Sequence, residues 1–205
     1  MPSPLFVGLS GHLDNLKEDL LDLHVQFEGL GRAHLTRALA FRLLSSAAVE
    51  EYVEQRCTAL AIEGAGRFLS GRPTRTGQAL VLWFRAAKTR GPLALSISEH
   101  LPQPKLVEDA CNAYVSSVKN THGMSGKDLS NLAWPLGCQD RDIDELLLGL
   151  LDSWSIERNR TAHARLHKIR AETTPQGEWD LVRNQILPLL LQLDDRLEEV
   201  LTTGP

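Results

Sequence analysis

Residues 157–164 carry the side chains best suited to chemistry on a phosphate. The segment reads Glu-Arg-Asn-Arg-Thr-Ala-His-Ala, so Arg158 is followed directly by Asn159 and, five positions on, by His163. A guanidinium group binds phosphate oxygens through a fixed fork of N–H donors. An imidazole, whose unperturbed pKa is about 6.5, exchanges protons readily at neutral pH. This combination points to an anionic ligand and to proton transfer.

The helix expected before Arg158 carries an apolar stripe made of Ile143, Leu146, Leu147, Leu150, Leu151 and Trp154. Arg158 continues the line of Leu147, Leu151 and Trp154. Arginine is rarely buried unless it is paired, so this position requires an acidic partner or an anionic ligand, and both remain open. On one unbroken helix five residues turn about 500°, which leaves the side chains of Arg158 and His163 about 140° apart. They converge on one phosphate only if the helix breaks between them or if two protomers face each other.

The sequence contains no complete metal-binding or cofactor-binding motif. His163 and His167 have the i, i+4 spacing of metal ligands, but Ala164 stands where a zincin has Glu, and no third ligand is clustered with them. There is no glycine-rich phosphate loop and no GxSxG sequence. The three cysteines are far apart and form no CxxC pair, which fits reduced thiols in the cytoplasm. We expect no metal and no cofactor.

The charge is unevenly distributed. The net charge is −4, yet residues 64–98 and 158–170 contain no Asp or Glu. The first stretch carries basic residues at Arg67, Arg72, Arg75, Arg85, Lys88 and Arg90, and the second at Arg158, Arg160, Arg165, Lys168 and Arg170, with His163 and His167. A local phosphate-binding surface is compatible with a net negative charge because salt screens distant repulsion within about 8–10 Å. A solvated helix face explains each stretch equally well.

Helical periodicity dominates the chain, and no strand pattern or internal repeat stands out. We expect helices at 13–27, from 32 past 60, at 76–88, 106–118 and 140–157, and at about 178–202, where Pro188 indicates a kink or a later start. A polar loop is expected at 120–131. No apolar run approaches the about 18 residues of a membrane span, and the first residues lack the basic start of a signal peptide. The sequence predicts an all-α bundle, one cytoplasmic domain over residues 1–205, with no membrane partner.

In this context the chain resembles the HEPN domain family, in the branch of small ribonuclease-like proteins labelled RiboL-PSP-HEPN. The family motif is Arg, four to six residues, then His, with a polar residue, commonly Asn, after the Arg; Arg158-Asn159-Arg160-Thr161-Ala162-His163 fits it. The apolar LLLGLLDSWSIERNR precedes the motif, RALAFRLLSSAAVEEYVEQ resembles the family's second helix, and LSNLAWPLG resembles a short segment that ends in a Leu-Gly turn. The resemblance covers about residues 10–170.

The resemblance implies a HEPN-like helical bundle that dimerises with its two motifs facing each other. It also implies metal-independent cleavage of RNA that leaves a 2′,3′-cyclic phosphate and a 5′-hydroxyl. His163 then acts as the acid or base, Arg158 holds the scissile phosphate, and Asn159 orients the His or a phosphate oxygen. Glu50, on the face of Leu43 and Ala47, is the expected partner of Arg158. Contacts with flanking RNA phosphates are expected from Arg160, Arg165, His167, Lys168 and Arg170.

Three functions remain open at this point. The first is a metal-independent endoribonuclease, a toxin or antiviral defence effector with an antitoxin or another defence-system protein as a partner. The second is a non-catalytic HEPN-like module that binds RNA or a protein, in which Arg158 has a structural role. The third is a regulatory subunit whose acidic stretches, 140–157 or 194–199, bind a basic partner. Some HEPN toxins are inactivated at a Tyr two residues after the His; Arg165 stands there, so that control is not implied.

Overall fold

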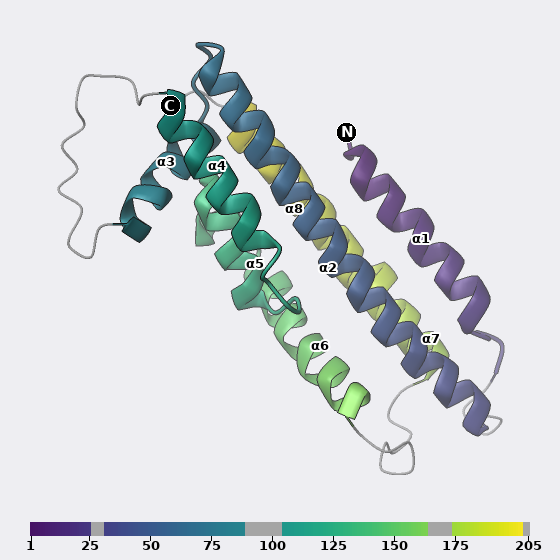
Figure 1. The fold of residues 1–205 in the computed structure, drawn as a ribbon. Coiled ribbons are helices and arrows are strands. Elements are labelled where there is room, and N and C mark those ends of the chain that lie inside the picture. Colours follow the sequence, from purple (N-terminus) through teal and green to yellow (C-terminus); the bar gives the residue numbers. More distant parts are fainter. Residues whose placement is uncertain (26–30, 89–103, 164–173, 203–205) are drawn as a thin grey trace. The chain divides into compact units, whose positions relative to one another are not determined.

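The computed structural model describes residues 1–25, 31–88, 104–163 and 174–202, and within these it does not describe the side chains of Lys88, Asp140 and His163. The described chain is helical and contains no strand, which confirms the all-α prediction (Figure 1). The elements are α1 (Pro4–Leu20), α2 (Arg32–Leu69), α3 (Arg75–Lys88), α4 (Pro104–Val118), α5 (Gly126–Ala133), η2 (Trp134–Leu136), η3 (Asp140–Asp142), α6 (Glu145–His163), α7 (Pro175–Asp180), η5 (Leu181–Ile186) and α8 (Leu187–Thr202). None of the described helices is long and apolar enough to cross a membrane.

The first helix lies earlier in the chain than the predicted 13–27. The Ser3 hydroxyl accepts the N–H of Phe6 and Pro4 opens the helix, a favourable start because one otherwise unpaired N–H is satisfied and another is absent. Its buried face is Phe6, Leu9 and Leu13. After Leu20 the chain becomes extended at Leu21, which is itself buried, so the helix ends seven residues before the predicted end.

Helices α2, α3 and α4 lie close to their predicted positions. Two other predictions, the loop at 120–131 and the start of a helix at residue 140, are wrong. The predicted loop 120–131 contains the start of α5, whose Gly126 N–H is bound by the Asp152 carboxylate at 2.9 Å. Helix α6 begins at Glu145 rather than at residue 140, because the Asp144 carboxylate accepts the N–H of Leu146 at 2.8 Å. These side chain–backbone contacts satisfy N–H groups that have no partner within a helix.

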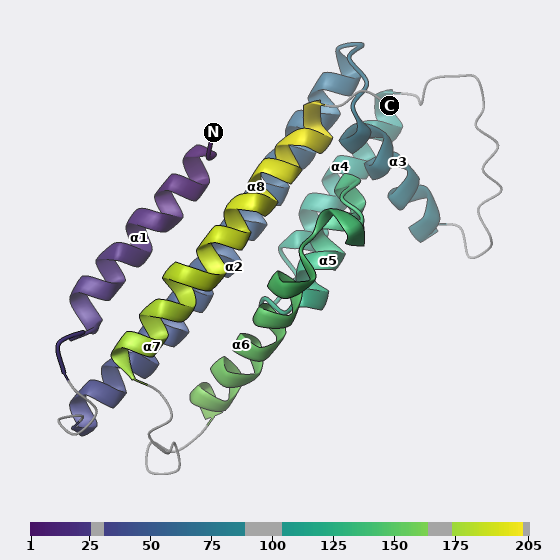
Figure 2. The same cartoon turned by 180° about the vertical axis from the view of Figure 1, so that it is seen from behind.

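The C-terminal helical region is divided where Pro188 requires it. Figure 2 shows α7, η5 and α8 as one continuous ribbon, in which η5 is π-helical and Leu187 donates its N–H to the Val182 carbonyl. Pro188 has no N–H, and in a regular α-helix its ring clashes with the carbonyl four residues earlier, that of Asn184. The wider π turn just before Pro188 relieves that clash. The predicted kink is therefore a π-helical segment.

The chain divides into two compact units. The first consists of Met1–Val53, Gly123–Lys127 and Asp144–Asp194, and the second of Glu54–His122, Asp128–Ile143 and Asp195–Pro205. Borders between the units fall within α2, α5 and α8 and also between helices, so neither unit is a contiguous stretch of chain. The prediction of one domain stays a prediction. Arg158 and Glu50 both belong to the first unit.

Candidate functional site

Arg158 lies beside Glu50, as the sequence predicts, within the first unit. Its Nη2 is 3.9 Å from Oε2 of Glu50, and the Arg158 and Glu50 side chains are 29% and 18% exposed. This is an ion pair at the long end of the range rather than a hydrogen bond. Arg158 has no other hydrogen bond or ion pair among the described residues, so most of its N–H donors remain available.

Glu50 is itself held by the turn before α5. Its Oε1 accepts the backbone N–H of Gly123 at 2.6 Å, which leaves Oε2 directed to Arg158. Gly123 has a φ of 92°, a conformation that side chain-bearing residues rarely adopt. A Cβ at this position would lie 3.4 Å from Nη1 of Arg158, so the turn is in close contact with the guanidinium. Sequence analysis did not find Gly123; the only signal was a Gly in a polar stretch.

The other motif residues lie on the last turns of α6. Asn159 and Arg160 are exposed, and Arg160 forms an ion pair with Glu157 at 3.6 Å. His163 is the last residue of α6, and its side chain lies outside the described structure. The predicted RNA-contacting residues Arg165, His167, Lys168 and Arg170 also lie outside the described residues.

Helix α6 runs without a break from Glu145 through His163. The alternative in which a helix break lets Arg158 and His163 converge is therefore wrong. The two Cα–Cβ directions differ by about 140° on this helix. The other predicted route to convergence, a second protomer that faces the first, stays a prediction.

The apolar stripe of α6 is narrower than predicted. Leu147, Leu151 and Trp154 are buried, and Arg158 follows them on the same side. Leu146, which the sequence placed on the stripe, is 61% exposed, and Ile156 is 65% exposed. Ile156 and Arg160 are spaced i, i+4 and share the opposite, exposed side of the helix.

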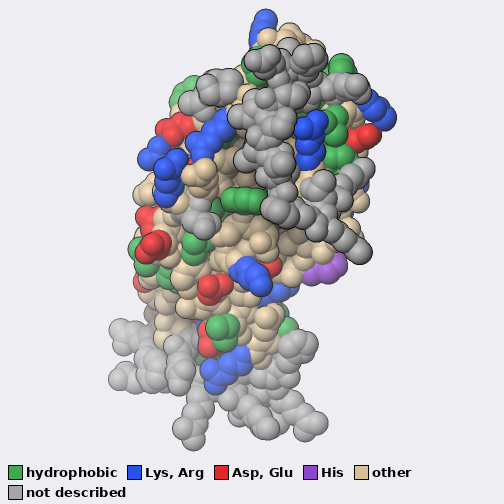
Figure 3. Space-filling view, turned by 90° about the vertical axis from the view of Figure 1, so that its left-hand side faces the viewer, with side chains coloured by type: hydrophobic (Ala, Val, Ile, Leu, Met, Phe, Trp, Pro, Cys, Tyr) green, Lys and Arg blue, Asp and Glu red, His purple; other side chains and the backbone are tan. Residues whose placement is uncertain are grey.

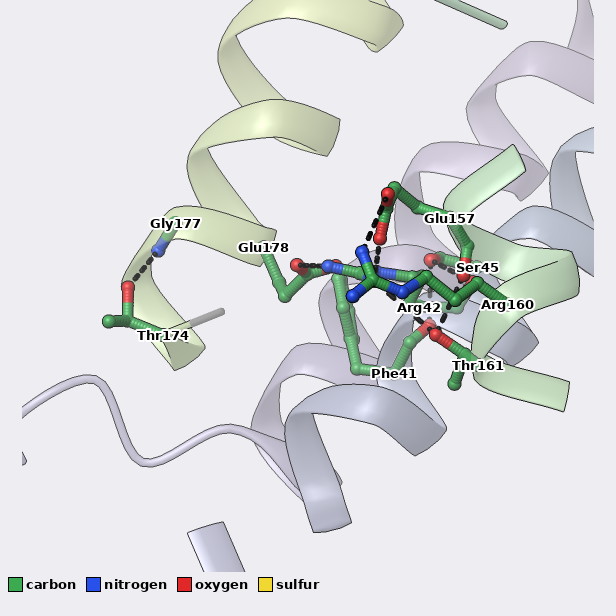
Figure 4. A network of polar contacts seen from close by, with 9 residues as sticks. All are labelled: Phe41, Arg42, Ser45, Glu157, Arg160, Thr161, Thr174, Gly177 and Glu178. Atoms are coloured by element: carbon green, nitrogen blue, oxygen red, sulfur yellow. Dashed lines mark hydrogen bonds and ion pairs between the residues drawn. The ribbon is translucent and has the colours of Figure 1, made fainter. Parts of the chain in front are cut away.

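A more deeply buried arginine was missed by sequence analysis. Arg42 of α2 is 8% exposed and forms two hydrogen bonds with Glu178 of α7, whose side chain is 5% exposed. It also contacts Glu157 and Thr161 of α6 (Figure 4). Burial by itself lowers the pKa of Arg42, but the hydrogen bonds and charge of Glu178, with the charge of Glu157, raise it overall. The signal in the sequence was a lone Arg within the apolar run ALAFRLL.

The acid-free stretch 64–98 is partly neutralised by acids from outside it. Arg67 pairs with Glu63 at 2.6 Å and Arg75 pairs with Asp142 at 3.1 Å, both within the second unit. On the described part of the face in Figure 3, Lys and Arg side chains stand among acidic and apolar ones. Lys88 has no described side chain, and Arg90 lies outside the described residues. The described part of this stretch does not form a purely basic surface.

Comparisons with known proteins add no family to these observations. A scan against protein-family models gives no match, and neither the curated proteins nor the solved structures give one. Within the described residues, no group of three or more His, Cys, Asp or Glu side chains could hold a metal ion. The resemblance of residues 158–163 to the HEPN motif therefore remains a prediction, and the described part of the chain is all-α.

Proposed function

We propose that this protein is a metal-independent endoribonuclease. Its reaction is attack of a ribose 2′-hydroxyl on the adjacent phosphorus, with a proton removed from O2′ and the 5′-oxygen leaving with a proton. The products are a 2′,3′-cyclic phosphate and a 5′-hydroxyl. The observation that carries the proposal is the Arg158 site: a half-buried guanidinium, oriented by Glu50 from one side, most of whose N–H donors have no partner among the described residues. Such a group stabilises charge that builds up on a phosphate in the transition state.

The roles follow from the positions on α6. Arg158 binds the scissile phosphate, and Glu50 with the Gly123 N–H orients it. His163 transfers the proton at O2′ or at the leaving 5′-oxygen, for which imidazole is suited at neutral pH. Asn159 and Arg160 are exposed beside Arg158 and contact the ribose or phosphate backbone of the RNA. Arg165, His167, Lys168 and Arg170 extend this contact to flanking phosphates.

A second copy of the chain completes the site. Arg158 and His163 diverge on an unbroken α6. In this proposal one RNA phosphate therefore contacts Arg158 of one chain and the histidine at the same position of a second copy. The proposed protein is therefore a homodimer, with a toxin or antiviral defence role and an antitoxin or another defence-system protein as its regulator.

The test is cleavage of a mixed pool of single-stranded and structured RNA in excess EDTA, with mapping of the product ends. We expect wild type to cut and to leave cyclic phosphates, and Arg158→Ala and His163→Ala each to lose activity by about 10²-fold or more. His12→Ala, which changes an exposed histidine of α1, is the matched control and keeps full activity. Cleavage by His163→Ala at the wild-type rate contradicts the assignment.

The Glu50 contact also favours a second candidate, a non-catalytic helical module that binds RNA or a protein. In that case Arg158 has a structural role only, through its ion pair with Glu50, and no RNA is cut. Wild type that binds the RNA pool without cutting it supports the module. A folded Arg158→Ala that loses cleavage but not stability supports the enzyme.

A further inference from the structure

Arg42 is the most deeply buried cation near the proposed site, and the proposed chemistry does not use it. Its Nε and Nη2 donate to the two carboxylate oxygens of Glu178 at 3.0 and 2.5 Å, a bidentate pair in a region where both side chains are almost inaccessible. The pair neutralises the buried charge. Further donors of Arg42 are thus not needed for charge balance and serve another contact.

The remaining terminal nitrogen of Arg42 is directed to the end of α6. Nη1 donates to the Thr161 hydroxyl oxygen at 3.3 Å and lies 3.4 Å from Oε2 of Glu157. The same Thr161 hydroxyl donates to the Glu157 backbone carbonyl at 2.8 Å. Figure 4 shows the three elements meeting at Arg42: α2 below, α7 with Glu178, and α6 with Glu157 and Thr161. One hydroxyl therefore connects the last turns of α6 to the buried ion pair.

The contact between Arg42 and Thr161 lies in the last turn of α6. Helix ends open most easily, because their last carbonyls have no partner within the helix. Thr161 lies two residues before the final helical residue, His163, and Glu157 directly precedes Arg158. Thr is also a weaker helix former than Ala by roughly 0.5 kcal/mol, so its presence in the last turn requires a compensating contact.

We propose that Thr161 is a positioning residue for His163: Arg42, fixed by Glu178, holds the Thr161 hydroxyl and so keeps the last turn of α6 helical through His163. Thr161 touches neither substrate nor the reacting atoms. Its effect on cleavage rests on the proposed ribonuclease function. Its effect on the order of the last turn does not.

The test compares Thr161→Val with Thr161→Ser. Valine keeps the branched shape and loses the hydroxyl, whereas serine keeps the hydroxyl; Thr161 is half-exposed, so neither variant creates a large cavity. In Thr161→Val we expect kcat to fall about tenfold with KM nearly unchanged, because a catalytic group displaced by about 1 Å costs up to 10²-fold while Arg158 still binds the phosphate. Thr161→Ser retains cleavage within about twofold.

Amide hydrogen exchange gives a readout that needs no activity. Amides of residues 159–163 exchange faster in Thr161→Val than in wild type, and at the wild-type rate in Thr161→Ser. Equal exchange in Thr161→Val and wild type overturns the positioning role, whatever the cleavage result. If wild type cuts no RNA but Thr161→Val still opens the last turn, the ribonuclease function fails and the positioning role stands.

Discussion

Arg42 and Arg158, two arginines of the first unit, differ in how many of their N–H donors are bound by neighbouring side chains. Arg42 uses Nε, Nη1 and Nη2 in hydrogen bonds and is almost inaccessible. Arg158 makes a single long ion pair with the residues that the structure describes, and its side chain is 29% exposed. A guanidinium with satisfied donors stabilises the fold, while one with spare donors can bind an anion. At the scale of single residues, this contrast separates a structural arginine from a candidate ligand-binding one.

The contrast predicts different stability losses for the same substitution. Arg42→Met should lower the free energy of unfolding by about 3–5 kcal/mol, because the carboxylate of Glu178 stays buried without its partner. Arg158→Met should lower it by less than about 1 kcal/mol, since Glu50 keeps its bond to Gly123 and the lost pair is long and partly exposed. Urea denaturation of both variants checks this. A loss in Arg158→Met as large as in Arg42→Met indicates a purely structural role for Arg158.

At the scale of elements, α2 and α4 bring two buried polar side chains together within the apolar core of the second unit. Cys57 of α2 is inaccessible and hydrogen-bonded to Tyr114 of α4, whose hydroxyl donates to the Leu132 carbonyl at 2.6 Å. Burial raises the pKa of the Cys57 thiol to about 12, and the Tyr114 hydrogen bond offsets this only in part. Burial also raises the pKa of Tyr114. Cys57 is therefore a neutral thiol at physiological pH, unsuited to nucleophilic attack.

These raised pKa values predict a loss of stability in alkali. In the unfolded chain Cys57 ionises near its ordinary pKa of 9.0, while in the folded chain it stays protonated until about 12. Its contribution to the free energy of unfolding is fully present below pH 9 and is lost between these two values, at about 1.4 kcal/mol per pH unit. Urea midpoints at pH 8 and pH 10 measure the fall. Cys57→Ala is the comparison: a fall of the same size in that variant assigns the alkaline loss to other groups.

At the scale of the whole molecule, the unbroken α6 makes a second chain part of the proposed site. Mixing Arg158→Ala and His163→Ala chains should restore cleavage that neither has alone, because a mixed dimer contains one intact Arg158 opposite one intact His163. With random exchange about a quarter of the wild-type activity returns. Sedimentation of wild type measures the assembly. A monomeric wild type, or active dimers whose mixed variants stay inactive, contradicts a site shared between chains.

Much of the fold followed from local patterns in the sequence. Helices α2, α3 and α4 were predicted because apolar residues recur at helical spacing. The start of α1 also has a local signal, because Ser3 is an N-cap residue and Pro4 is favoured at the first helical position. The predicted helix at 13–27 did not include it. Spacing also predicted that Arg158 continues a buried stripe. The resemblance to the HEPN family led to Glu50 as its partner, and the structure places the two charged groups 3.9 Å apart. Periodicity and caps are decided by neighbours a few residues apart, so they are present in the sequence itself.

The tertiary structure decided which charged groups are already satisfied. Arg42 and Glu178 are 136 residues apart in the chain, and Glu50 meets the Gly123 turn across 73 residues. Neither contact has a local signal, because an ion pair depends on which side chains of distant helices come within about 4 Å. The same applies to the continuity of α6 through Thr161. From the sequence alone we predicted residues able to bind a phosphate and move a proton. Packing determined that the Arg42 donors are used within the fold, whereas Arg158 makes one long ion pair among the described residues.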